Sequence, residues 1–235
     1  MLAGGLRAWL EDELADLAGV IDPTAPVILS PRTVFGGRMI SVPPVIAIAR
    51  GALVSALVSQ RLIFGHIEHP MDDALSALEA DPTQRDLVDA VHSLEPDAFA
   101  QLAAEVAAHD AVLARELGSV PSSWLPRSMV RLSASLAGGR FVLSGVADVM
   151  VGPPARDVAS VCLLDVTTTT PDDLVNARLG VLALIETLRS SAPPLRVASL
   201  STTTGETVIV DVTDTTLTTA LCDVVDAAKR RGGTS

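Results

Sequence analysis

The spacing of apolar residues changes once along this chain, near Pro121, and that change constrains the fold more than any other feature. Before it, apolar residues recur at helical spacing, as Leu6, Leu10 and Leu14 do. After it, residues 129–136 alternate apolar with polar side chains, which is typical of a half-buried strand. We therefore predict an α/β fold with a helical N-terminal part over residues 1–120 and an α/β core over 121–235. We expect the two parts to form one compact domain.

The helical part is predicted to contain a long buried helix over residues 45–64, because that stretch is apolar nearly all round. We expect this helix to pack onto the core. Residues 22–44 hold five prolines and predict an irregular connector. The apolar stretch Val42–Val58 is interrupted by Pro43, Pro44 and Arg50 and is too short to span a bilayer, so we expect no membrane span. The other predicted helices cover 6–18, 71–80, 83–93 and 96–117.

The core is predicted to run in the order β-β-β-α-β-β-α. Gly138 and Gly139 can supply the positive φ of a tight hairpin between the first two strands. Thr170 can cap the first core helix, with Pro171 at its first position. The predicted strands are 129–136, 140–151, 160–166, 195–200 and 207–212, and the predicted helices are 171–189 and 215–230.

Two aspartates stand on neighbouring predicted strands. Asp148 lies on the second strand, and Asp165 follows it by seventeen residues, inside the apolar third strand. A lone charge is costly to bury there, so we predict that the two acids share a site. Hard oxygen ligands suit Mg²⁺ or Mn²⁺, which makes Asp148 and Asp165 the candidate metal ligands. The alternative for Asp148 is an exposed acid near a strand end.

Several segments, in this order, resemble the RecB-like branch of the PD-(D/E)XK nuclease superfamily. The matching segments are Leu29-Ser30-Pro31-Arg32, residues 50–57, residues 139–148 ending in Asp148, and Leu163-Leu164-Asp165-Val166-Thr167. The resemblance implies a restriction-endonuclease-like core, with a mixed central sheet flanked by helices. It also implies catalytic roles for the two acids and for the positions around them.

The chain departs from that family's pattern at its lysine, at its first-motif histidine and in the helix that follows, where residues 176–182 lack the family's glutamine and tyrosine. Thr167 stands where the family has a lysine, and Ser55 where the first motif has a histidine. The cysteines that some relatives use are missing, so no iron–sulfur cluster is expected. Arg178 is a possible substitute cation, and His66 could enter the site from a displaced position. The resemblance therefore implies a pseudoenzyme with impaired cleavage.

The formal net charge of −11 disfavours autonomous binding to nucleic acid. We therefore expect a cytoplasmic, RecB-like subunit of a DNA-processing or defence complex, in which a partner protein helps it to reach DNA. One alternative is an active Mg²⁺- or Mn²⁺-dependent DNA nuclease with an unusual site. A second alternative is a protein-interaction module with no nucleic-acid role. For the threonine-rich runs we expect a structural role.

Overall fold

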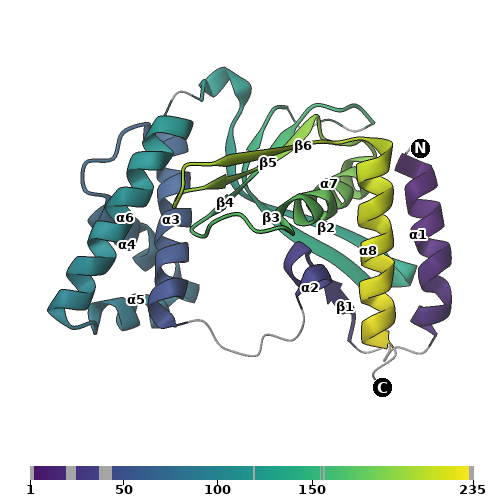
Figure 1. The fold of residues 1–235 in the computed structure, drawn as a ribbon, viewed down its shortest axis with the longest axis horizontal. Coiled ribbons are helices and arrows are strands. Elements are labelled where there is room, and N and C mark those ends of the chain that lie inside the picture. Colours follow the sequence, from purple (N-terminus) through teal and green to yellow (C-terminus); the bar gives the residue numbers. More distant parts are fainter. Residues whose placement is uncertain are drawn as a thin grey trace.

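The fold is α/β, as the change of periodicity predicts, with an open mixed sheet flanked by helices (Figure 1). The computed structural model of the chain describes residues 3–19, 25–36, 44–118, 120–153, 155 and 157–232. Within these ranges the sheet has six strands: β1 (Val27–Leu29), β2 (Arg127–Leu136), β3 (Phe141–Val151), β4 (Cys162–Thr167), β5 (Arg196–Ser201) and β6 (Thr207–Asp211).

Strand β3 organises the sheet. Along one edge it pairs antiparallel with β2. On its other edge it pairs with two strands: β1 runs parallel to residues 141–143, and β4 runs antiparallel to residues 149–151. β4 is then parallel to β5, and β5 is antiparallel to β6. The β4–β5 crossover is made by α7, because parallel neighbours cannot be joined by a tight turn.

The helices divide into two groups by what they cover. The first group, α1, α7 and α8, shares an apolar cluster with the sheet around the fully buried Phe141. The second group, α3 to α6, shares a separate cluster that includes Val149 and Leu200 of the sheet. The helices are α1 (Ala3–Ala18), α2 (Pro31–Phe35), α3 (Val45–Phe64), α4 (Pro70–Glu79), α5 (Arg85–His92), α6 (Pro96–Leu117), α7 (Val175–Ser190) and α8 (Asp214–Gly232).

Helix α3 is the long apolar helix predicted from the sequence. Among the described residues it is the one helix long and apolar enough, by length and composition, to cross a membrane; 33% of its most apolar stretch is buried. It packs against α4, α5 and α6 through residues such as Leu53 and Leu57. It also carries Arg61, whose buried guanidinium forms two hydrogen bonds with the Asp110 carboxylate of α6, at 2.7 and 2.6 Å.

Three predictions about local structure are wrong. The first core helix begins at Val175 and not at Pro171, because the side chain of Asp172 bonds the Leu174 amide and holds the preceding residues in a loop. The predicted irregular connector contains β1 and α2, while its residues 22–24 and 37–43 lie outside the described ranges. The helix over residues 45–64, predicted to be buried, is buried on one side only, and Ile48 and Ile63 are exposed.

Candidate functional site

A break in the pairing of β3 creates the candidate site. β1 pairs as far as Leu143 and β4 starts to pair at Val149, so residues 144–148 have no strand beside them on this edge within the described ranges. A cavity of about 850 Å³ opens there. Its lining comes from separate elements and includes Arg32 of α2, Ser144 and Val146 of β3, Asp165 and Thr167 of β4, and Arg178 of α7.

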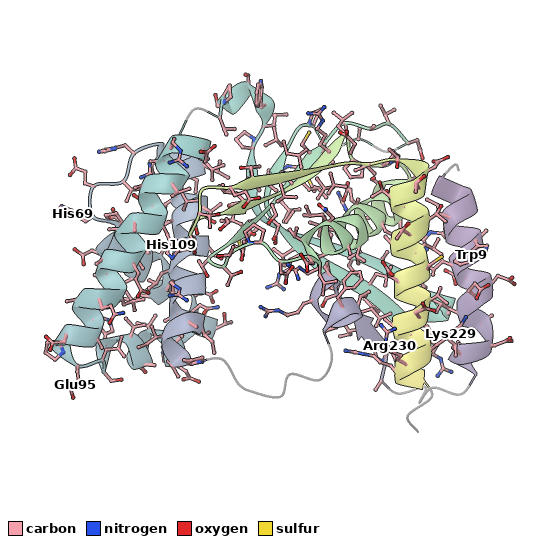
Figure 2. All side chains as sticks on the ribbon, in the orientation of Figure 1. Trp9, His69, Glu95, His109, Lys229 and Arg230 are labelled. Atoms are coloured by element: carbon pink, nitrogen blue, oxygen red, sulfur yellow. The ribbon has the colours of Figure 1, made fainter. Side chains whose placement is uncertain are left out.

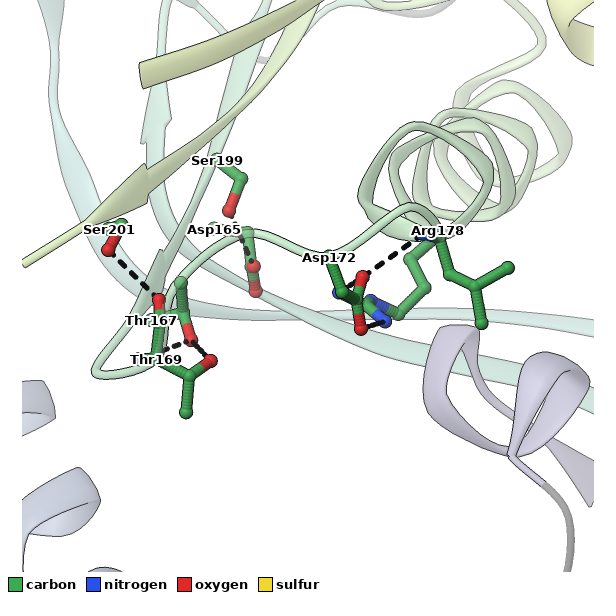
Figure 3. A network of polar contacts seen from close by, with 8 residues as sticks. Asp165, Thr167, Thr169, Asp172, Arg178, Ser199 and Ser201 are labelled. Atoms are coloured by element: carbon green, nitrogen blue, oxygen red, sulfur yellow. Dashed lines mark hydrogen bonds and ion pairs between the residues drawn. The ribbon is translucent and has the colours of Figure 1, made fainter. Parts of the chain in front are cut away.

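Asp165 lies in this cavity near the end of β4. The hydroxyl of Ser199, on the parallel neighbour β5, donates to its Oδ2 at 3.3 Å (Figure 3). Burial raises the pKa of Asp165 above its ordinary value, while the Ser199 hydrogen bond and the charges of Arg178 and Arg32 act in the opposite direction. Burial is the larger effect, so the ionised carboxylate lacks sufficient compensation.

Asp148, on the neighbouring strand β3, is more buried than Asp165, with only 9% of its surface exposed. Its Oδ2 accepts a hydrogen bond of 2.6 Å from the amide of Val166, the residue after Asp165. Burial raises the pKa of Asp148 to about 7; the Val166 hydrogen bond lowers it, and the charge of Asp165 raises it further. The structure therefore places the two predicted acids next to each other, although only Asp165 lines the cavity.

Thr167, at the position of the missing lysine, has a structural set of contacts. Its hydroxyl lies 2.9 Å from that of Thr169, and its carbonyl accepts from both the amide and the hydroxyl of Thr202. The hydroxyl of Ser201 likewise donates to the carbonyl of Thr169 (Figure 3). The hydroxyl of Thr203 donates to the carbonyl of Thr168. These threonine-rich runs join the β4–α7 loop to the β5–β6 turn, which supports their predicted structural role.

Arg178 lines the cavity but is held by another residue. Its two terminal nitrogens bond the two carboxylate oxygens of Asp172 at 3.0 and 2.8 Å (Figure 3). The sequence singled out Arg178 but not its partner Asp172, whose place in the loop before α7 was predicted to be helical. The sequence also identified Arg32 only as part of the segment that resembles the family's opening, and not as a site residue.

Ser55 and His66 do not line the cavity. Ser55 is half-buried on α3, and its carbonyl accepts from the hydroxyl of Ser59 at 3.4 Å. His66 is exposed in the loop after α3, as is His69, which projects from the helical part at the far left of Figure 2. These residues belong to the α3–α6 group and do not join the two acids.

The donor set at the two acids suits a hydrated divalent cation. Among the described residues, no group of three or more His, Cys, Asp or Glu side chains comes together, so the protein offers no complete cage. Mg²⁺ is commonly bound through one or two carboxylates and keeps several waters. Asp148 is buried and its neighbour Asp165 is half-buried, and neither forms an ion pair with a described residue. A divalent cation would supply the missing positive charge.

No model of a known protein family matches this chain, and no curated protein matches its sequence.

Proposed function

We propose that this protein is a nuclease-like subunit of a DNA-processing or genome-defence complex, impaired in cleavage, that keeps a divalent-cation site at Asp148 and Asp165. The observation that carries the proposal is that the buried Asp148 of β3 and the half-buried Asp165 of β4 lie together beside the unpaired stretch of β3, where the charge of Asp165 helps to raise the pKa of Asp148. Without a bound cation, such a pair of acids would only lower the stability of the fold.

The order of elements also supports the proposal. β2, β3 and β4 follow one another antiparallel, α7 crosses over, and β5 lies parallel to β4. The acids fall on the second and third of these strands. This is the arrangement that the resemblance to PD-(D/E)XK nucleases implies, and it includes β1 and α2, which contain the segment similar to the family's opening.

The chemistry of the cavity explains why cleavage would be impaired. A bound Mg²⁺ or Mn²⁺ would neutralise charge on a phosphate and lower the pKa of a water molecule. The chain would hold the cation through Asp165 and Asp148. The lysine's preorganised positive charge is missing, because Thr167 is neutral and Arg178 is committed to Asp172. Losing one such group costs on the order of a hundredfold or more in rate.

A direct test measures cleavage and binding of a fluorescent DNA oligonucleotide, single- and double-stranded, with Mg²⁺ and with Mn²⁺. We expect salt-sensitive binding without cleavage. Mn²⁺-dependent cleavage that is lost in Asp148→Asn would contradict impairment and identify an active nuclease. Absence of both binding and cleavage would leave a protein-interaction module. Asp16→Asn, a change of an exposed acid on α1, serves as the matched control.

A further inference from the structure

Arg32 occupies a rigid position at the mouth of the cavity. It is the second residue of α2, whose start is fixed by Pro31 and by reciprocal hydrogen bonds between Ser30 and Thr33. The other end of the helix is held by Arg230 of α8, which donates to the Val34 carbonyl at 2.9 Å. Figure 2 shows Arg230 on α8 close to α2. The backbone that presents Arg32 is therefore braced on both sides.

The guanidinium of Arg32 differs from those of its neighbours. Arg178 is committed to Asp172, and Arg230 to a carbonyl of α2. Arg32 is exposed and lines the cavity, and its side chain forms no hydrogen bond or ion pair with any residue in the described part of the chain. Its charge nevertheless reaches Asp165 and acts to lower the pKa of that acid. An uncommitted cation beside the acid pair has the chemistry of an anion-binding group.

We propose that Arg32 binds a phosphate group of a nucleic-acid backbone at this cavity, beside the cation that Asp148 and Asp165 would hold. This inference rests on the proposed function for its ligand class. A guanidinium matches phosphate geometry, because its parallel N–H groups can bond two oxygens at once. The carboxylate of Asp165 repels the same phosphate until a divalent cation neutralises it. Arg32 therefore acts with or without the cation, and the cation adds to the affinity.

The experiment measures binding of a fluorescent single-stranded deoxyoligonucleotide by anisotropy, over a series of salt concentrations, in Mg²⁺ and in EDTA. Arg32→Gln is expected to weaken binding about tenfold in both conditions. It should also reduce the slope of log affinity against log salt by about 0.7, because one phosphate contact is lost. A purely structural role for Arg32 would leave that slope unchanged. Arg32→Lys, which keeps the charge, should retain most of the slope.

Two further variants make the test specific. Arg85→Gln removes an exposed arginine of α5 that does not line the cavity, and it should bind like wild type. Arg178→Gln should lose less affinity than Arg32→Gln. The assignment is overturned if wild type does not bind, if Arg32→Gln binds like wild type, or if Arg178→Gln loses as much. Failure of the cation site would appear separately, as affinity that is equal in Mg²⁺ and EDTA.

Discussion

The helical part and the cavity each bury carboxylates, but only the helical part supplies the opposing charge. Asp110 receives two hydrogen bonds from Arg61, and both side chains are about 95% buried. Asp148 and Asp165 have one amide, one hydroxyl and two nearby arginine charges between them, and neither is in an ion pair with a described residue. One site is complete within the chain, and the other lacks a cation.

This difference separates a structural role from a binding role. The buried ion pair fixes how α3 packs on α6. Arg61 already bonds both carboxylate oxygens of Asp110, so the pair offers no free charge to a ligand. Acids without a counter-ion in the interior lower the free energy of unfolding, and a cation that binds them raises it again. The two sites should therefore respond in opposite ways when a charge is removed.

The largest effect is expected in the helical part. Arg61→Leu leaves Asp110 buried without a partner, so we expect a loss of about 3–5 kcal/mol in the free energy of unfolding measured with urea. The double variant Arg61→Leu/Asp110→Leu should recover much of that loss. Arg85→Leu on α5 is the control for an exposed arginine. A loss below about 1 kcal/mol in Arg61→Leu would show that Asp110 does not depend on Arg61, and the contrast between the two regions would fail.

In the cavity, removing a charge should raise the free energy of unfolding instead of lowering it. Because the pKa of Asp148 rises from 3.8 to about 7 on folding, the unfolded chain ionises first as the pH rises. The contribution of Asp148 to the free energy of unfolding is then fully present below about pH 4. It is lost progressively toward pH 7, by roughly 4 kcal/mol at most. Asp148→Asn should remove most of that fall in urea unfolding without divalent cations. A wild-type stability that rises over this interval, with Asp148→Asn unchanged, would refute the account of this acid.

Restoring the missing charge should sharpen the comparison. Thr167→Lys places an ammonium group near the acids, while the contacts of the Thr167 carbonyl with Thr202 are kept. We expect about 1 kcal/mol of added stability at pH 8 and a gain of Mn²⁺-dependent DNA cleavage. Thr218→Lys on the exposed side of α8 adds the same charge away from the cavity. Equal effects of the two substitutions would deny any special role to position 167.

The smallest effects are expected for Ser55 and His66, which the sequence suggested as site residues but which lie outside the cavity. Ser55→Ala and His66→Ala should each change stability by less than about 0.5 kcal/mol. They should also leave Mn²⁺ binding, followed by calorimetric titration, unchanged. A marked loss of Mn²⁺ affinity in His66→Ala would place that histidine at the site and redraw the boundary between the two regions.

The sequence predicted the class of fold and the pair of acids because both depend on local signals. Alternation identified β2, the Gly138-Gly139 turn indicated β3 as the returning strand, and an acid in the apolar run of β4 marked Asp165. What it could not predict depends on contacts between distant segments. Asp172 holds the start of α7 open, and β1 joins the sheet only because β3 offers it an edge.

The individual site residues show the same limit. Arg178 looked available because its sequence position says nothing about the bidentate bond to Asp172. Arg61 and Asp110 gave no sequence signal, since they are forty-nine residues apart on separate helices. A pattern in one segment can identify a charged residue, but it cannot tell whether another segment has already paired that charge.

The most direct test of the shared cation site is anomalous X-ray diffraction at the manganese edge, from crystals grown with Mn²⁺ at pH 8. We predict one strong peak between Asp148 and Asp165, within roughly 2.5 Å of a carboxylate oxygen of each residue. Asp165→Asn crystals under the same conditions should lack that peak. A wild-type map with no manganese peak between the two acids would contradict the cation site. So would a map in which the two carboxylates point away from each other.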